Sequence, residues 1–290
     1  MINNLEKIFS DSAKNMKRSA IREILKLTQN PEVISFAGGL PAPESFPVQE
    51  LKQILIELLD EEGADALQYS ATEGITELRE VLLERYQKEG MKVGIDNLTI
   101  TTSSQQGLYL LGKIFLDKGD KAICGLPSYL GGVCAFNTFG VDLHGIRSDH
   151  KGMRSDHLEE KLHELEGQGY KPKFIYVIPD FQNPTGITMP ESRRKEILTL
   201  ARKNDIPIIE DSPYREIRFE GEHQKTLYQL DNNGQVTLLG SLSKTFAPGL
   251  RLGWAIGPKE IIERMVIAKQ SLDLCRSEER RVGKECATGC

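Results

Sequence analysis

Two kinds of hydrophobic pattern alternate along the chain. Apolar residues recur every third or fourth position between Val48 and Leu58, and again between Ile75 and Tyr86, which is typical of helices with one buried face. Other stretches are short and largely apolar, at residues 98–100, 122–124, 174–178, 206–209, 236–239 and 254–256. Short runs of this kind predict strands that are buried on both faces of a sheet.

The order of these patterns predicts the fold class. Helical stretches of about 10 to 15 residues separate several of the runs, and strands that alternate with helices in this way form βαβ crossovers. We therefore expect an α/β protein with a mostly parallel sheet. Ligands of such sheets gather at the carboxyl ends of the strands, so polar residues that follow the runs are candidates for a binding site.

One lysine lies shortly after the run at residues 236–239, in a setting that suggests chemistry. Lys244 follows Ser241 and Ser243, and Arg251 comes after a glycine-containing turn. A neutral lysine amine can condense with an aldehyde cofactor, while serine hydroxyls, backbone N–H groups and a guanidinium can hold a phosphate. The alternative is a solvated lysine in a Ser- and Gly-containing loop. Cofactor contacts elsewhere in the chain decide between the two interpretations.

Such contacts are present, and in a set order. Residues 183–186 read Asn-Pro-Thr-Gly, residues 211–214 read Asp-Ser-Pro-Tyr, and the Lys244 segment follows them. In these motifs the chain resembles the fold type I aminotransferases of class I/II, which use pyridoxal 5'-phosphate (PLP). Within that group, the segments at 34–43, 67–70 and 101–107 resemble bacterial 2-aminoadipate aminotransferases and the related domain of MocR-type transcription regulators. The resemblance extends from about Arg22 to about Asp273 and implies the α/β/α large domain of that family.

The resemblance assigns roles to the residues that would surround the cofactor ring. It implies that Asp211 keeps the ring nitrogen protonated, and that Tyr214 and Asn183 hydrogen-bond the phenolic oxygen of the ring. Lys244 would carry the cofactor and shuttle a proton, so Lys244, Asp211 and Tyr214 form the expected catalytic set. Taken alone, Asp211 also fits a helix N-cap and Asn183 an Asn-Pro turn.

A second group of residues would bind the phosphate and cover the ring. The implied phosphate contacts are Ser104, Gln105, Ser241, Ser243 and Arg251. Ser104 and Gln105 stand at an expected helix start, where free backbone amides and the helix dipole favour an anion, although simple capping of that helix is the alternative. Tyr129 resembles the aromatic residue that stacks on the ring, and core packing would also explain it.

Substrate contacts are expected from Arg22, Gly39 and Asn183. Arg22 resembles the arginine that meets an acidic substrate side chain, with a solvated helix-face cation as the alternative, and Gly39 would let the backbone approach the ligand. Tyr69 resembles the residue that reaches the phosphate of the neighbouring subunit's cofactor. This resemblance implies a homodimer with shared active sites, and a cross-strand or helix-flank tyrosine is the alternative.

Composition narrows the partners and the location. A net charge of −5 with interspersed signs offers no basic face to a nucleic acid, and no apolar run approaches the roughly 20 residues that span a bilayer. The five cysteines contain no Cys-x-x-Cys pair, and His144, His150, His157 and His163 are interpreted as helix or loop surface, so no metal site is expected. We expect a cytoplasmic protein whose partners are an amino acid, a 2-oxo acid and a second copy of itself.

Three segments are expected along the chain: residues 1–46 as an N-terminal helix and arm, 47–274 as the large PLP-binding domain, and 275–290 as a foreign tail. Residues 276–286 break the apolar rhythm of the preceding helix and closely resemble the translation of a common sequencing-adapter oligonucleotide. A genuine charged tail is the alternative. Family members continue into a smaller C-terminal domain, which we expect to be missing here together with the arginine that binds the substrate α-carboxylate.

These features together predict a PLP-dependent aminotransferase that moves an amino group from an amino acid such as glutamate or 2-aminoadipate to a 2-oxo acid. Two alternatives stay open. One is the PLP-binding effector domain of a MocR-type regulator, although the chain begins too close to its PLP motifs to hold an upstream DNA-binding domain. The other is a truncated fragment without activity. Fold type I scaffolds also host decarboxylases and lyases, so the fold alone does not define the reaction.

Overall fold

The computed structural model describes residues 7–10, 13–14 and 39–275 of the chain. The chain divides into two compact units, Met1–Phe46 and Pro47–Cys290. The described part of the first unit includes the short 3-10 helix η2 (Pro43–Ser45). All other elements named below belong to the second unit.

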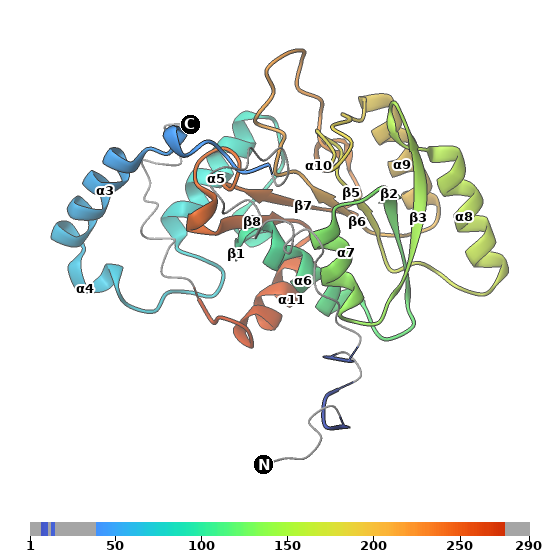
Figure 1. The fold of residues 1–290 in the computed structure, drawn as a ribbon, viewed down its shortest axis with the longest axis horizontal. Coiled ribbons are helices and arrows are strands. Elements are labelled where there is room, and N and C mark those ends of the chain that lie inside the picture. The colour runs from blue at the N-terminus through green and yellow to red at the C-terminus, as the bar shows by residue number, and fades with distance from the viewer. Residues whose placement is uncertain (1–6, 11–12, 15–38, 276–290) are drawn as a thin grey trace, which may run out of the picture. The chain divides into compact units, whose positions relative to one another are not determined.

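An eight-stranded sheet forms the centre of the second unit, in the order β1-β8-β7-β6-β5-β2-β3-β4 (Figure 1). The strands are β1 (Leu98–Thr102), β2 (Lys121–Leu126), β3 (Asp142–Asp149), β4 (Gly152–Met153), β5 (Ile175–Val177), β6 (Ile208–Asp211), β7 (Val236–Ser241) and β8 (Leu252–Ile256). Strands β3, β2, β5, β6 and β7 are parallel, whereas β8 is antiparallel to both of its neighbours and β4 is antiparallel to β3. The prediction of an α/β fold with a mostly parallel sheet is confirmed.

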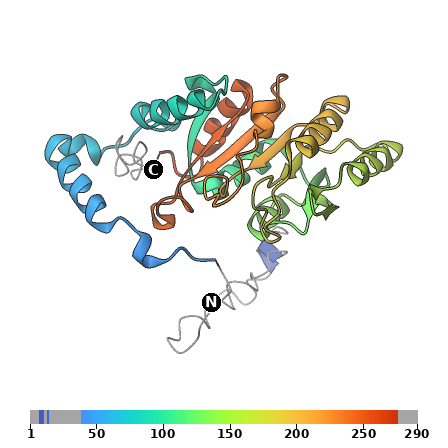
Figure 2. The same ribbon diagram turned by 90° about the horizontal axis from the view of Figure 1, so that it is seen from above.

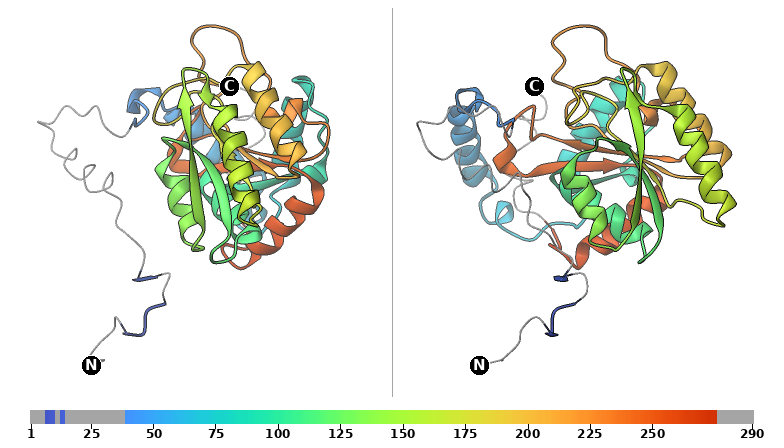
Figure 3. Two further views of the ribbon diagram at one scale, coloured as in Figure 1. Left: turned by 90° about the vertical axis from the view of Figure 1, so that its right-hand side faces the viewer. Right: turned by 45° about the vertical axis from the view of Figure 1, so that its right-hand side comes forward.

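Helices cover both faces of this sheet (Figures 1 and 2). The described helices are α3 (Val48–Glu61), α4 (Gly63–Ala66), α5 (Thr76–Lys88), α6 (Ser103–Phe115), α7 (Leu130–Asn137), α8 (Ser155–Gly167), α9 (Glu191–Lys203), α10 (Leu227–Leu230) and α11 (Lys259–Gln270), with the short 3-10 helices η3 (Ile95–Asn97) and η4 (Pro248–Leu250). Helices α6, α7 and α11 pack on one face. Helices α5, α8, α9 and α10 pack on the other, with α8 and α9 side by side (Figure 3).

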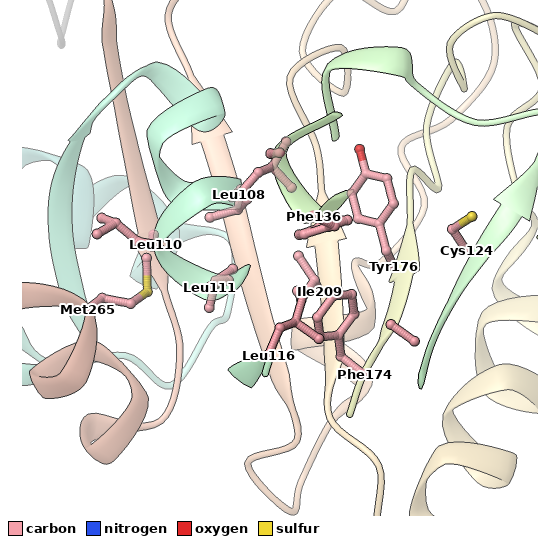
Figure 4. Packing of buried hydrophobic residues seen from close by; sticks show 14 of the residues in the cluster. Leu108, Leu110, Leu111, Leu116, Cys124, Phe136, Phe174, Tyr176, Ile209 and Met265 are labelled. Atoms are coloured by element: carbon pink, nitrogen blue, oxygen red, sulfur yellow. The ribbon is translucent and has the colours of Figure 1, made fainter. Parts of the chain in front are cut away.

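Successive residues of the central strands enter the two different cores. In β6, Ile208 packs into the cluster under α8 and α9, while Ile209 packs into the cluster under α6 and α7, part of which Figure 4 shows. In β7, Leu238 and Leu239 divide in the same way. Because side chains alternate along a strand, a sheet covered on both faces needs apolar residues at every position. This requirement explains why the strand signal in the sequence is a continuous run.

Both predicted helical stripes form helices, but they are buried to different degrees. The stripe that ends near Gly90 becomes α5, and its residues Leu78, Val81, Leu82 and Tyr86 are buried against the sheet. The stripe after Pro47 becomes α3, in which no residue is buried. Amphipathic spacing therefore identified both helices, while the extent of their burial depends on which elements pack against them.

Strands β3 and β4 lie outside the predicted strands. β3 has partly exposed and polar side chains such as Asp142 and Arg147, so it lacks the apolar run on which the prediction depends. The expectation that the four histidines lie on helix or loop surface is wrong for His144, which belongs to β3. His157 and His163 do lie in α8, and His150 lies in the turn that joins β3 to β4.

The strand directions gather several chain segments at one edge of the sheet. Strands β1, β2, β5, β6 and β7 run the same way, so their carboxyl ends meet there, and β8 begins at the same edge because it runs in the opposite direction. Asp211 and Ser241 end β6 and β7, Ser103 follows β1 directly, and Arg251 precedes β8. Residues far apart in the sequence are thereby brought to one place.

Candidate active site

Lys244 lies in the turn that follows β7, where it is half-buried. Burial lowers the pKa of its ammonium group, and the nearby Arg251 guanidinium lowers it further. The Lys244 Nζ lies 5.7 Å from the centre of the Tyr214 ring, on the segment that follows β6. A lysine with a lowered pKa reaches its neutral form more readily, and only the neutral amine is a nucleophile.

Asp211, the last residue of β6, is 1% exposed, and only one of its two carboxylate oxygens has a hydrogen-bond donor among the described residues. Its Oδ2 accepts a hydrogen bond of 2.9 Å from the Tyr176 hydroxyl, whereas its buried Oδ1 accepts none from the described residues. Burial raises the pKa of Asp211 to about 7, and the hydrogen bond from Tyr176 opposes that rise. Buried acceptors are almost always paired in proteins, so Oδ1 is suited to a donor that is not part of the chain.

Asn183 and Tyr214 form a hydrogen-bonded pair, and Tyr214 follows Asp211 by three residues. The Asn183 Nδ2 donates a hydrogen bond of 3.2 Å to the Tyr214 hydroxyl oxygen, and burial raises the pKa of Tyr214. The Asn183 loop is fastened by Gln182, whose side-chain amide donates to the Pro127 carbonyl and whose Oε1 accepts from the Thr185 backbone. These bonds hold two polar side chains together at the carboxyl ends of β5 and β6.

A cluster of serines and one guanidinium forms where β1, β7 and β8 meet. The Arg251 Nη2 donates to the Ser103 Oγ at 2.5 Å, and the Ser241 Oγ donates to the Ser243 Oγ at 2.9 Å. Ser103 is the first residue of α6, whose first turn leaves backbone N–H groups without partners inside the helix and carries the positive end of the helix dipole. Hydroxyls, amides and a guanidinium are the groups that bind a phosphate dianion.

The close fit of this cluster depends on a glycine. A Cβ added to Gly253 would lie 2.5 Å from the carbonyl carbon of Ser103, so only glycine lets the start of α6 rest against β8. Ser103 and Arg251 both have left-handed backbones, with φ of 57° and 53°. Non-glycine residues adopt this conformation rarely, and such residues concentrate at functional sites.

Gln105 and Tyr129 contact each other next to this cluster. The Tyr129 hydroxyl donates to the Gln105 Oε1 at 3.2 Å, and the Gln105 Nε2 donates to the Gly131 carbonyl at 2.9 Å. Tyr129 is half-buried and is the residue immediately before α7. The side chain of Gln105 therefore holds the aromatic ring in position, in addition to any contact that its backbone makes.

The structure brings most of the candidate residues together at one sheet edge, but not all of them. Ten of them lie at or just beyond the strand ends described above: Lys244, Asp211, Tyr214, Asn183, Ser104, Gln105, Tyr129, Ser241, Ser243 and Arg251. Tyr69 follows α4 and is 77% exposed. Gly39, with φ of 55°, belongs to the first unit, and Arg22 lies outside the described residues.

Sequence reasoning missed three residues that shape the site. Ser103 rather than Ser104 meets Arg251, and Tyr176 bonds to Asp211 from within a run that signals only a core strand. Asp273, after α11, accepts hydrogen bonds from the Thr102 hydroxyl at 3.0 Å and the Gln106 amide at 2.7 Å, which ties it to the start of α6. No signal in the sequence singles out these contacts, because each joins segments that are distant along the chain.

Two features are absent from the described residues. No group of three or more His, Cys, Asp or Glu side chains within residues 7–10, 13–14 and 39–275 is arranged to hold a metal ion. Over the same residues, no helix is long and apolar enough to cross a membrane.

Residues 31–276 match the family model described as aminotransferase class I and II, and the chain belongs to this family. It is 47% identical over 272 residues to aromatic-amino-acid aminotransferase 1 of Thermococcus litoralis, and the aligned region covers 93% of this chain and 65% of that protein. It is 40% identical over 269 residues to the 2-aminoadipate transaminase of Thermus thermophilus, and here the aligned region covers 92% of this chain and again 65% of the relative. The chain thus spans slightly less than two thirds of these curated relatives.

A solved structure agrees with this membership. The crystal structure of Pyrococcus horikoshii kynurenine aminotransferase in complex with PMP aligns with a TM-score of 0.91 at 44% identity. The alignment covers 97% of this chain and 69% of that one. The resemblance to fold type I aminotransferases inferred from the sequence motifs is confirmed at the level of family and fold.

Proposed function

We propose that the sheet edge binds pyridoxal 5'-phosphate and that the protein transfers an amino group between an amino acid and a 2-oxo acid. The observation that carries the proposal is the pairing, at one edge, of a lysine whose pKa is lowered with a buried carboxylate oxygen that has no partner in the described chain. Family membership and the names of the relatives, which are aminotransferases, support the same reaction.

The residues at this edge fit the cofactor group by group. The unpaired Asp211 Oδ1 suits the N–H of a protonated pyridine ring, and the Asn183–Tyr214 pair suits the phenolic oxygen. The phosphate would be held by Ser104, Gln105, Ser241, Ser243 and Arg251, with Ser103 joining them through its bond to Arg251. The Tyr129 ring would cover the face of the cofactor. When bound, PLP supplies an electron sink that makes the Cα–H bond of an amino acid acidic.

The side chains of this protein supply the remaining chemistry. The Lys244 Nζ provides the amine that condenses with an aldehyde, and once released it accepts the proton from the substrate Cα and returns it, as general base and then acid. The ionised Asp211 holds positive charge at the ring nitrogen. Tyr214 and Asn183 hold the phenolic oxygen by hydrogen bonds, and the serines and Arg251 fix the orientation of the whole group.

The substrate and assembly belong to the same proposal. We take the amino donor to be 2-aminoadipate, glutamate or a related amino acid, with Arg22, Gly39 and Asn183 as substrate contacts. The names of the relatives, which include a 2-aminoadipate transaminase, support this class.

We also propose a cytoplasmic homodimer in which Tyr69 reaches the phosphate of the cofactor in the neighbouring subunit. The 77% exposure of Tyr69 leaves its side chain available for such a contact.

Absorbance spectroscopy of the purified chain tests the proposal. Adding PLP should produce the visible band of a lysine-linked cofactor, which borohydride abolishes by fixing the link. Adding 2-aminoadipate or glutamate should then convert the band to that of the pyridoxamine form. Lys244→Ala should lose the band and all turnover, while Lys259→Ala, which alters an exposed lysine paired with Asp96, should keep both. A wild-type chain without a lysine-linked band would refute PLP binding, and a band without turnover would refute the transfer reaction.

A further inference from the structure

A buried tyrosine on the strand next to β6 donates a hydrogen bond to Asp211. Tyr176 lies in β5, where its backbone pairs with Ile209 of β6, two residues before Asp211. Its side chain is fully buried, and its hydroxyl donates to the Asp211 Oδ2 at 2.9 Å. Burying a phenol hydroxyl is costly unless it is hydrogen-bonded, so this bond satisfies the tyrosine as well as the aspartate.

The position of Tyr176 is fixed from behind by helix α7. The Phe136 ring meets the Tyr176 ring edge-on, with centres 5.3 Å apart and planes at 76°. A Cβ on Gly132 would lie 2.9 Å from the Tyr176 hydroxyl oxygen, so α7 leaves no room for the hydroxyl to withdraw. Figure 4 shows the ring beside Phe136, with its hydroxyl at the end away from Phe174. The hydroxyl is therefore confined between α7 and Asp211.

This confinement makes the two oxygens of Asp211 different. Oδ2 is occupied by Tyr176, and Oδ1 is buried without a partner among the described residues. We propose that Tyr176 is a positioning residue for the cofactor: it holds Oδ2 so that Oδ1 is presented, in ionised form, to the ring nitrogen. This inference rests on the proposed function and extends it to a residue outside the cofactor contacts named above.

The electrostatics of the pair agree with that geometry. Burial raises the pKa of Asp211 to about 7, and the bond from Tyr176 is the interaction that lowers it. Besides burial, Tyr129 before α7 and Cys124 on β2 raise the pKa of Tyr176, and Asp211 in turn raises the pKa of Tyr214 after β6. Because a hydrogen bond to a charged group stabilises that charge, its loss should raise the pKa of Asp211 further.

The consequence is a shift in where one proton resides. An aspartate with a higher pKa competes better for the proton of the ring nitrogen, so removal of the Tyr176 hydroxyl should move that proton toward the carboxylate. The affinity for PLP should fall with it, because a neutral pair attracts less than an ion pair. A tyrosine that merely fills the core would change the thermal stability of the protein without either effect.

Three variants separate these roles. Tyr176→Phe removes the hydroxyl but keeps the ring, and Gly132→Ala keeps the hydroxyl but displaces it. Tyr170→Phe removes a hydroxyl from a half-exposed ring that stacks with Lys121, and it serves as the matched control. Two quantities are measured for each: the dissociation constant for PLP, and the chemical shift of isotopically labelled PLP ring nitrogen in the bound state.

We expect Tyr176→Phe to bind PLP about tenfold more weakly or worse, with a ring-nitrogen shift that moves toward the unprotonated form. Gly132→Ala should change both quantities in the same direction, and Tyr170→Phe should match the wild type. A Tyr176→Phe protein with unchanged affinity and an unchanged nitrogen shift would refute the positioning role while leaving the proposed function intact. A wild type that takes up no PLP would refute the proposed function, and with it the reason for presenting Oδ1.

Discussion

Glu210 and Asp211 are neighbours in β6, and both are fully buried carboxylates, yet their surroundings differ. On one face of the sheet, Glu210 accepts hydrogen bonds from the backbone N–H groups of Leu227 and Tyr228 and lies 4.0 Å from the Arg194 guanidinium. On the other face, Asp211 has Tyr176 at one oxygen and no protein partner at the second. One carboxylate is saturated with partners and the other is left with an open acceptor.

The pKa does not distinguish these two residues, whereas their partners do. Burial raises the pKa of each carboxyl group to about 7. A perturbed pKa is a common sign of a functional residue, but structural ion-pair networks produce it as well. The comparison teaches that the unsatisfied oxygen, rather than the shifted pKa, indicates which of the two carboxylates is available to a ligand.

Removing Arg194, the buried cation beside Glu210, should have the largest effect on stability. The buried Arg194 guanidinium donates to both oxygens of Asp180 and to the carbonyls of Pro179, Met189 and Lys225. Arg194→Met should lower the free energy of unfolding by about 3–5 kcal/mol, because it removes the buried guanidinium that is paired with the Asp180 carboxylate. Urea denaturation measures this loss. Lys195→Met, which breaks an exposed pair with Glu191, should cost no more than about 0.5 kcal/mol, and a similar loss in both variants would contradict the account.

Changing the two carboxylates separately should produce opposite patterns. Asp211→Asn should reduce the rate of amino transfer by about 100-fold or more, since it removes the charge opposite the ring nitrogen. Glu210→Gln should leave the rate within a few-fold but lower the free energy of unfolding by about 1–3 kcal/mol. Steady-state kinetics and denaturation of the same two proteins give the result. The comparison fails if Glu210→Gln loses activity as severely as Asp211→Asn.

The pH dependence of stability sharpens the comparison further. The folded-state pKa of Asp211, about 7, lies above its unfolded value of about 3.9, so the native state binds more protons between these values. The contribution of Asp211 to stability is therefore complete below about pH 4 and is lost as the pH rises through about 7. Relative to Asp211→Asn, the PLP-free wild type should lose up to about 4 kcal/mol over this range.

Added PLP should change the pH dependence that Asp211 causes but not the one that Glu210 causes. A ring N–H at Oδ1 stabilises the ionised form of Asp211, so saturating PLP should flatten the difference between wild type and Asp211→Asn. The corresponding difference for Glu210→Gln should persist, because its partners are all part of the protein. Thermal melts between about pH 4 and 8 measure both differences. Equal flattening at both positions would show that PLP does not act through Asp211.

Much of the fold and part of the site could be predicted from the sequence, for a common physical reason. Strands such as β6 and β7 are apolar at successive positions because helices cover both of their faces, and that signal is local. Lys244 and Asp211 could be predicted as candidates because they belong to short motifs that occur in a recognisable order. β3 was missed because its side chains are only partly buried, so its sequence lacks such a run.

The remaining features depend on contacts that no local pattern encodes. Tyr176 belongs to an apolar run, and only the register of β5 against β6 turns it into the partner of Asp211. The meeting of Arg251 with Ser103 requires left-handed backbones at both residues and the missing Cβ of Gly253. These are properties of the assembled sheet edge, so the motifs indicate the candidate residues but not the contacts between them.

In the function we propose, PLP attaches to Lys244. The most direct test is borohydride reduction of the PLP-loaded chain, followed by proteolysis and mass spectrometry of the modified peptide. We predict a pyridoxyl group on Lys244, in near-stoichiometric yield, with the exposed Lys259 unmodified. A label on another lysine, or a chain that remains unlabelled at saturating PLP, would contradict it.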